Sequence, residues 1–471
     1  MSEDYKIRRE HVEKTHVEVV GPSQYGKSTV AEWVMSRLLQ EEEAGLLLID
    51  PLGDSYRKYI GWLTEGIIQR PAWLVDLDEA PLRYNPLQVA KKNPSAYIPG
   101  LYEALTLIHS DSPAVGQHRE MRRHVMATLH ALIDNDLPLT AAAEWLQDED
   151  FKTGKTFRTT ERIYRIRDLK ERAIWKANPS KNELRSTVNW FDAFGSGPLN
   201  PMFSGNGFNW DEVYPTQAMV LVNLSSQNLG DSELWMRGLA TMFINGLHQA
   251  GFFAKEKYRW YAVIDDAQFY TPPTVGKYLL GDRHFDLYYW LIHHFAFPSA
   301  MQNCVDQGCT TKFFFGDIPH DYRRNEWDGG YYRGDDGQLK KASVHHWFNH
   351  YGQQITWPPD AKQVEGVKSL PKHECLYVAE RQVFGRFKFP PTPKPDVTEG
   401  DIDLFKDWVY SKPEYGVKAE PPESSASAVL PKVPPPLPSP GAETVTQGMR
   451  TPNPRGTRRQ REQKEANQSD P

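Results

Sequence analysis

The 471-residue sequence is poor in cysteine and contains no long apolar run, and both facts restrict its class. Cys304, Cys309 and Cys375 form an odd set without regular spacing, which disfavours a disulfide framework and favours a reducing, intracellular setting. Cys304 and Cys309 could supply half of a zinc site, but no second cysteine pair completes a tetrahedral set. No stretch reaches the roughly 18–20 apolar residues that cross a bilayer. The charged start of the chain has no signal-peptide pattern, so we expect a cytoplasmic protein without direct membrane insertion.

The chain also has little excess charge of either sign. Its net charge is −6, with 25% charged and 39% hydrophobic residues, which is enough apolar material for a large core. The length fits two or three domains, or a single α/β core that carries insertions. Mild acidity does not exclude nucleic acid as a partner, because a local basic channel can coexist with a negative net charge.

Seven short apolar runs have the length and composition of buried parallel strands. They lie at residues 16–20, 45–50, 71–78, 218–225, 259–266, 287–294 and 311–317. Helical patterns separate these runs, and a longer, polar helical stretch separates the third from the fourth. The predicted fold is therefore an α/β fold with a doubly wound, mainly parallel sheet that an all-α insertion interrupts. Residues 374–389 could form a closing hairpin.

We expect four parts along the chain. The core occupies residues 12–92 and 211–395, and the mainly helical insertion occupies residues 93–210. From about Lys412 the sequence is rich in proline, serine and charge, so we expect residues 412–471 to be a disordered tail with a basic end. Its segment PKVPPPLPSP favours polyproline II in a solvated linker, and binding of a protein partner through the tail is the alternative.

The strongest motif is GPSQYGKST at residues 21–29, which has the Gly-x-x-x-x-Gly-Lys-Ser spacing of a phosphate-binding loop. An apolar run precedes it and a helical pattern follows it, as this loop requires. The glycines let backbone N–H groups approach the phosphates, the lysine reaches the β- and γ-phosphates, and the serine hydroxyl can hold Mg²⁺. We therefore predict a nucleotide site formed by Gly21, Pro22, Ser23, Gln24, Tyr25, Gly26, Lys27, Ser28 and Thr29. Tyr25 could lie near the nucleotide or be a plain surface aromatic residue.

Carboxylates follow two of the predicted strands. Asp265 and Asp266 end the run WYAVIDD, where a buried strand can deliver a metal-holding acid and a second acid that polarises the attacking water. Asp50 ends the run GLLLID and should face the same crevice, since parallel strands place ligands at their carboxyl ends. The alternatives are an acidic helix cap for the pair and an ordinary turn for Asp50.

Weaker candidates follow other strands. Gln227 could respond to the γ-phosphate, and Arg283 could supply positive charge to the phosphate of a neighbouring subunit; plain surface roles are the alternative for both. His293 and His294 interrupt an apolar run, and we interpret them as buried, hydrogen-bonded histidines in preference to a metal site.

The order of these motifs resembles one family. The segments HVEVVGPSQYGKST, GLLLIDPLGDSY, VDLDEAPLRYNPL, AMVLVNLSSQNLG, YAVIDDAQFY and GDRHFDLYYWLI are similar to the HerA/FtsK superfamily of P-loop ATPases. Within it, the sequence most resembles HerA-like ATPases and the cytosolic domains of type IV secretion coupling proteins. IDPLGD and YNPL are the more specific segments, and the resemblance covers roughly residues 12 to 390. It implies a RecA-like core and a ring, usually a hexamer, that hydrolyses ATP between subunits and pulls DNA through its pore.

The resemblance also implies roles for single residues. Lys27 and Ser28 would hold phosphate and Mg²⁺, Asp265 would be the metal-holding acid, and Arg283 matches the arginine before the next strand. Asp266 stands where the family usually has a catalytic glutamate, which is one methylene longer. His293 and His294 stand where that strand usually ends in Thr-Gln or Ser-Gln, and Gln302 is a candidate substitute. We expect no counterpart of the amino-terminal barrel or of the membrane anchors of these relatives.

These observations favour a Mg²⁺-dependent ATPase that moves DNA, most simply double-stranded DNA, as a homo-oligomeric ring. Conjugation, a mobile element, viral packaging or defence are all suitable settings. One alternative is an ATPase that acts on protein in secretion. Another is an assembly factor that binds ATP, forms a ring and hardly turns over, which the shorter acid at position 266 would suit.

Overall fold

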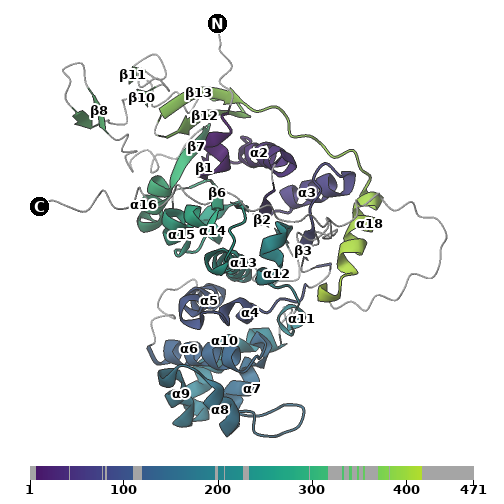
Figure 1. Cartoon of the computed structure of the whole chain (residues 1–471), viewed down its shortest axis with the longest axis vertical. Coiled ribbons are helices and arrows are strands. Elements are labelled where there is room, and N and C mark those ends of the chain that lie inside the picture. The colour runs from purple at the N-terminus through teal and green to yellow at the C-terminus, as the bar shows by residue number, and fades with distance from the viewer. Residues whose placement is uncertain are drawn as a thin grey trace, which may run out of the picture. The chain divides into compact units, whose positions relative to one another are not determined.

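A computed structural model describes most of the chain up to Tyr415 (Figure 1). The described residues are 7–41, 43–76, 78–79, 82–109, 119–196, 200–205, 207–225, 233–295, 297–316, 331–333, 339–341, 347–348, 354–355, 370–380 and 382–415. The expected tail from residue 416 onward lies outside the described residues, as does Gln227.

A nine-stranded sheet forms the centre of the fold, with the strand order β13-β12-β7-β1-β6-β5-β2-β4-β3. Its strands are β1 (His16–Val20), β2 (Gly45–Asp50), β3 (Ala72–Asp76), β4 (Met219–Asn223), β5 (Trp260–Ile264), β6 (Leu287–His293), β7 (Cys309–Phe315), β12 (Glu374–Ala379) and β13 (Gln382–Lys388). The first seven strands pair in parallel, and β12 and β13 add an antiparallel hairpin beside β7. All seven predicted strands and the closing hairpin are therefore confirmed.

The strands in the middle of the sheet are buried on both faces. Every residue of β1, β2, β5 and β6 is buried, which explains their continuous apolar sequences. The helices of this part are α1 (Glu10–Glu13), α2 (Lys27–Glu41), α3 (Asp54–Glu65), α13 (Glu233–Phe253), α14 (Ala267–Tyr270), α15 (Val275–Gly281) and α16 (Ser299–Gly308). Parallel strands need such crossover helices, and all seven strands end at the same edge of the sheet.

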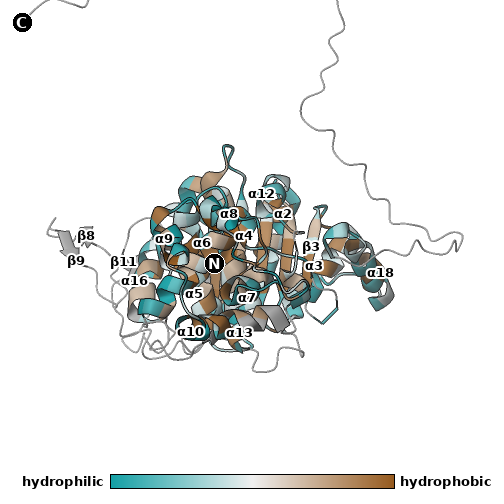
Figure 2. Cartoon of the chain, turned by 90° about the horizontal axis from the view of Figure 1, so that it is seen from below, coloured by the Kyte–Doolittle hydropathy of each residue, from teal (hydrophilic) through white to brown (hydrophobic). Residues whose placement is uncertain are grey.

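Helices fill the described chain between β3 and β4. They are α4 (Leu87–Ala90), α5 (Pro94–His109), α6 (Arg119–Asp134), α7 (Ala142–Gln147), α8 (Thr160–Arg165), α9 (Leu169–Lys176), α10 (Lys181–Ser196), α11 (Asn200–Phe203) and α12 (Trp210–Val213). Helix α5 packs against α13 and so joins this group to the sheet (Figure 1). Trp175 is a centre of the group, because its ring meets Trp145 edge to face and its Nε1 donates to the Ala127 carbonyl at 3.1 Å. Teal and brown stretches alternate along these helices, as expected for helices with one buried face (Figure 2).

The chain beyond β13 returns to the opposite edge of the sheet. Helix α18 (Glu399–Tyr410) begins with a capping box between Thr398 and Asp401 and packs against α3 and β3. Tyr415 is 2% exposed, and its hydroxyl accepts a hydrogen bond from the Leu74 amide at 2.7 Å and lies 2.9 Å from the Leu74 carbonyl. The Lys412 ammonium donates to the Ala72 carbonyl. The first residues of the expected tail, up to Tyr415, are thus packed against β3.

Four short strands form two small antiparallel ladders apart from the main sheet. They are β8 (Tyr331–Arg333) with β9 (Leu339–Lys341), and β10 (Trp347–Phe348) with β11 (Gln354–Ile355). Among the helices that the structure describes, none combines the length and apolarity needed to cross a membrane.

Candidate active site

The phosphate-loop motif connects β1 to α2 near the centre of the sheet, as its sequence context predicted. Gly21 has φ of 155°, and a Cβ at this position would lie 2.6 Å from the carbonyl oxygen of Phe315. Gly26 has φ of 102°, and a Cβ there would lie 2.8 Å from Nδ1 of His373. Both positions need glycine, because a side chain would meet a neighbour and the backbone lies in the left-handed half of conformational space.

Lys27 is the first residue of α2, and its side chain folds back over the loop. Its ammonium donates to the carbonyl of Pro22 at 3.0 Å and to Nδ1 of His294 at 3.0 Å. Burial lowers the pKa of Lys27 to about 8, although the carboxylates of Asp265 and Asp266 act in the opposite direction. The ammonium therefore has two hydrogen-bond partners, and two acids near it.

Ser28 and Asp265 meet directly at the end of β5. The Ser28 hydroxyl donates to Oδ2 of Asp265 at 2.7 Å, and the Asp265 amide donates to the Ile49 carbonyl at 3.0 Å. Burial raises the pKa of Asp265 to about 6, and the negative charges of Asp50 and Asp266 act in the same direction. Among the described residues no salt bridge to Asp265 is present, and a buried carboxylate beside a hydroxyl oxygen fits a hard divalent cation such as Mg²⁺.

Asp266 has a left-handed backbone, with φ of 48°, which turns the chain sharply into α14. Its Oδ1 lies 3.0 Å from Nε2 of His294 and accepts a hydrogen bond from Nε2 of Gln268 at 3.3 Å. Burial by itself would raise the pKa of Asp266, but the hydrogen bonds from His294 and Gln268 and the charge of Lys27 hold it below its usual value. The carboxylate is therefore ionised and held in one orientation.

The two adjacent histidines at the end of β6 have different surroundings. His293 is fully buried, with Nδ1 at 2.7 Å from the carbonyl of Phe295 and Nε2 at 3.0 Å from Oε1 of Glu18. Glu18 also pairs with Lys312 at 2.7 Å, inside the sheet below the loop. His293 is thus the buried histidine that we expected. His294 is not one, because it lies in the candidate site between Lys27 and Asp266.

The candidate substitute Gln302 is bound elsewhere. It is 2% exposed, its Oε1 accepts from the Phe297 amide at 3.1 Å, and its Nε2 donates to Asp306. The side chain beside the lysine is therefore His294, which sequence reasoning had placed in the core. The signal that could have found it is its position directly after β6, the strand that pairs with β1.

Asp50 organises the turn that begins α3. Its carboxylate accepts hydrogen bonds from the amides of Leu52, Gly53 and Tyr56, at 3.0, 3.0 and 2.7 Å. Burial raises its pKa, and these three donors act in the opposite direction. This is the turn role that the sequence left open, and a nucleotide contact of Asp50 stays a prediction.

The remaining residues of the motif include Ser23, Gln24, Tyr25 and Thr29. Ser23 Oγ lies 3.5 Å from Nδ1 of His294, and Gln24 has φ of 65°. Tyr25 packs against Gly316, where a Cβ would lie 2.4 Å from the tyrosine ring. Its carbonyl accepts a hydrogen bond from the His373 amide at 2.8 Å, so the turn before β12 lies against the loop. Thr29 is half-buried in the first turn of α2.

Arg283 lies away from the loop of its own chain. It is exposed and belongs to the 3₁₀ turn Asp282–Phe285, which precedes β6, whereas the phosphate loop lies beyond the carboxyl end of that strand. Seven residues of extended strand span roughly 20 Å. The two groups are therefore at opposite ends of β6.

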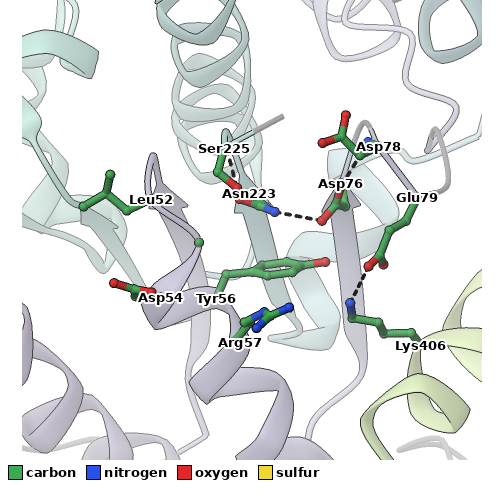
Figure 3. Close-up of a pocket in the computed structure, with 11 residues that line it drawn as sticks. Leu52, Asp54, Tyr56, Arg57, Asp76, Asp78, Glu79, Asn223, Ser225 and Lys406 are labelled. Carbon is green, nitrogen blue, oxygen red and sulfur yellow. Dashed lines mark hydrogen bonds and ion pairs between the residues drawn. The ribbon is translucent and has the colours of Figure 1, made fainter. Parts of the chain in front are cut away.

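A polar pocket of about 330 Å³ opens at the same sheet edge, after β2, β4 and β3 (Figure 3). Asn223 donates to Asp76 at 2.8 Å, and Lys406 from α18 pairs with Glu79 at 2.5 Å on its far side. The strands β5 and β6 separate this pocket from the phosphate loop, so it belongs to a different part of the edge.

Within the described ranges, no three His, Cys, Asp or Glu side chains are grouped to hold a metal ion.

No protein-family model matches the sequence, and no curated protein matches it. Solved structures match its fold. The bacterial conjugative coupling protein TrwBdeltaN70 in an unbound form gives a TM-score of 0.54 at 12% identity, over 82% of this chain and 88% of that chain. The plasmid coupling protein TrwB in complex with ADP and Mg²⁺ gives 0.54 at 11% identity, over 82% and 88%.

VirB4 of Thermoanaerobacter pseudethanolicus gives a TM-score of 0.50 at 13% identity, over 80% of this chain and 90% of that chain. These similarities extend over most of each chain, so they concern the whole arrangement of sheet and helices. They confirm the predicted fold class and the resemblance to coupling proteins at the level of the fold: the chain has the α/β P-loop fold of the conjugative coupling protein TrwB and of VirB4.

Proposed function

We propose that this chain is a Mg²⁺-dependent ATPase that moves DNA as a ring in a conjugation or type IV secretion system. One observation carries the ATPase part. The hydroxyl of Ser28 and the carboxylate of Asp265 meet at 2.7 Å beneath a glycine loop whose lysine is already inside the site. A phosphate loop with a metal-holding acid in this position is the arrangement that holds Mg²⁺ and a nucleoside triphosphate.

Each side chain then has a distinct role. The loop amides and Lys27 bind the β- and γ-phosphates, and Ser28 and Asp265 hold Mg²⁺, which would neutralise charge on the phosphates. Asp266 orients and polarises the attacking water, because it is the ionised carboxylate beside them. Its low pKa makes it a weak base, which suits a loose phosphoryl-transfer transition state that needs little proton removal.

The position of Arg283 supports a ring. It is exposed at the opposite end of β6 from its own phosphate loop, so any phosphate that it contacts belongs to another subunit. An arginine that arrives from another subunit stabilises the charge of the transition state and couples hydrolysis to assembly. A hexamer is the closed ring that the sequence resemblance implies.

The DNA part of the proposal rests on the fold. The structures that match most of this chain include a conjugative coupling protein, and one of its forms contains ADP and Mg²⁺. We infer double-stranded DNA as the polymer that is moved. A protein substrate is the alternative within the same enzyme class.

The test measures ATP hydrolysis with and without duplex and single-stranded DNA, together with oligomer mass with and without ATP. We expect hydrolysis that DNA stimulates and a mass that rises to a ring with ATP. Hydrolysis that no DNA stimulates would reject the translocase. Absence of ATP binding would reject the whole proposal, and Lys27→Ala is the negative control for binding.

A second candidate is an assembly factor that binds ATP and hardly turns over. The observation in its favour is that Asp266, already shorter than glutamate, has Oδ1 occupied by His294 and Gln268. Under this hypothesis Asp266→Asn changes neither hydrolysis nor ring formation, whereas Lys27→Ala abolishes both binding and assembly. Brisk hydrolysis that Asp266→Asn eliminates would exclude the assembly factor.

A further inference from the structure

His294 connects the two charged groups that the proposed reaction uses. Its Nδ1 lies 3.0 Å from the ammonium of Lys27, and its Nε2 lies 3.0 Å from Oδ1 of Asp266. Gln268 fixes the arrangement, because its Oε1 accepts from the His294 amide at 3.2 Å while its Nε2 donates to Asp266. The imidazole is therefore a bridge, and not a side chain that happens to be near.

The partners determine where the ring proton lies. An ammonium group only donates, so Nδ1 must accept with its lone pair, and an ionised carboxylate only accepts, so Nε2 must carry the hydrogen. In this arrangement Nδ1 of His294 accepts and Nε2 donates. In this form the ring separates Lys27 from Asp266 and satisfies both.

A bound triphosphate would compete with this bridge for the ammonium of Lys27. The lysine of a phosphate loop reaches the β- and γ-phosphates, and a phosphate oxygen is a stronger partner for an ammonium than a neutral imidazole nitrogen is. When Lys27 turns from Nδ1 to a phosphate oxygen, the hydrogen bond from Nε2 to Asp266 can remain. His294 thus loses its contact to Lys27 when the lysine binds phosphate. It keeps its contact to Asp266, the acid that orients the water.

We propose that His294 is a positioning residue that couples occupation of the phosphate site to the orientation of Asp266. The inference rests on the proposed ATPase function and deepens it. Bound to both groups, the ring links Lys27 to Asp266; once released from Lys27, it holds Asp266 alone.

Two substitutions separate this role from a structural one. Glutamine offers an oxygen that can accept from Lys27 and an N–H that can donate to Asp266, whereas leucine offers neither. The full-length chain carrying His294→Gln or His294→Leu is assayed for kcat and KM with ATP and Mg²⁺. Affinity for a non-hydrolysable ATP analogue is measured by calorimetry, and thermal unfolding is recorded for both variants.

We expect His294→Leu to lower kcat about 10- to 100-fold, as expected for a misoriented catalytic group. Affinity for the analogue should rise about fivefold, the worth of one hydrogen bond that Lys27 no longer has to exchange. His294→Gln should recover most of kcat and bind the analogue as the wild type does. His293→Gln is the matched neighbour: it should lower the melting temperature, because it disturbs the buried contact to Glu18.

Three results would overturn the inference: unchanged kcat in His294→Leu, a His294→Gln variant as poor as His294→Leu, or analogue affinity that stays equal or falls in His294→Leu. Failure of the proposed function looks different. A wild type that binds the analogue but never hydrolyses ATP, with or without DNA, rejects the ATPase. The affinity change in His294→Leu still decides whether His294 competes for Lys27, because that measurement needs no turnover.

Discussion

The hydroxyl of Ser28 donates a 2.7 Å hydrogen bond to the carboxylate of Asp265, across 237 residues of sequence. The sheet makes this contact, because β1 and β5 both flank β6 and all three strands end at one edge. The same edge brings Asp266 and His294 within reach of Lys27. The site is therefore assembled from residues that follow three different strands.

Replacing Asp265 by asparagine should separate stability from activity. Its pKa in the folded protein, about 6, lies above the ordinary value of 3.8, so the folded state binds its proton more tightly than the unfolded state does. The stability that this proton supplies is complete below about pH 4 and disappears as the pH rises through 6. At pH 7.5 without Mg²⁺, Asp265→Asn should therefore be more stable by about 1–2 kcal/mol in urea unfolding.

The gain from Asp265→Asn should shrink toward pH 4, and Mg²⁺-dependent hydrolysis should be lost at every pH. Asp54→Asn, at an exposed carboxylate in the first turn of α3, is the control and should change neither quantity. A stability difference that is constant from pH 4 to pH 8 would contradict the assignment of the buried charge.

Mixing two inactive variants should restore hydrolysis. Lys27→Ala lacks the phosphate lysine and Arg283→Ala lacks the arginine that we assign to the neighbouring site, so each ring alone should be inactive. In rings of equal and random composition, about a quarter of the interfaces combine an intact lysine with an intact arginine. Activity should recover accordingly in an ATPase assay.

Lys277→Ala serves as the control for Arg283→Ala, because it removes an exposed cation from the adjacent helix α15. It should remain active by itself. Mixed rings that form, as native mass spectrometry would show, but hydrolyse nothing would exclude a role of Arg283 across subunits.

The effect of C-terminal truncation on stability should change sharply at Tyr415. Removing residues 416–471 should leave the melting temperature unchanged, because the sequence beyond that point offers little apolar surface to bury. Removing residues 412–471 should cost about 3–5 kcal/mol, since it deletes a buried aromatic ring and the contacts to β3.

Tyr415→Phe measures how much the hydroxyl of Tyr415 contributes to that loss of stability. It keeps the ring but leaves the amide of Leu74 without the hydroxyl, so about 1–3 kcal/mol of unfolding free energy should be lost. Tyr164→Phe, at an exposed tyrosine in α8, should cost nothing measurable. A strong loss of stability in the 416–471 deletion would show that the tail contributes to the fold.

Gly26→Ala should weaken nucleotide binding and the fold together. The new methyl group would lie 2.8 Å from Nδ1 of His373, and the backbone would be strained at φ of 102°. Strain of this kind costs about 1–3 kcal/mol. Gly66→Ala is the matched control, because its φ of 79° gives a similar strain while nothing lies within 4 Å of the added carbon. A larger loss at Gly26 than at Gly66, measured by urea unfolding, is the expected result.

Sequence patterns predicted the strands and the loop because both depend on local chemistry. A continuous apolar run such as LLLI within GLLLID is expected when both faces of a strand are covered, and β2 begins and ends where GLLLID does. The loop followed from its glycine spacing, since few other residues tolerate its backbone.

The rest depended on which way side chains point after a strand ends. Asp50 and Asp265 both end apolar runs, yet three backbone amides hold the carboxylate of Asp50 while the hydroxyl of Ser28 meets Asp265. Composition could not distinguish them, because the direction is set by the turn that follows. The packing of Tyr415 was not predicted, since a single aromatic residue at the start of a polar segment gives no periodic signal.

The end of β6 illustrates how close two unrelated tasks can lie in one chain. His293, the last residue of the strand, faces Glu18 in the interior, while His294, the residue after it, faces Lys27. A saturation screen of these neighbouring codons should therefore give two uncorrelated profiles. Abundance in the cell should report on position 293 and motor output on position 294, with a single peptide bond between them.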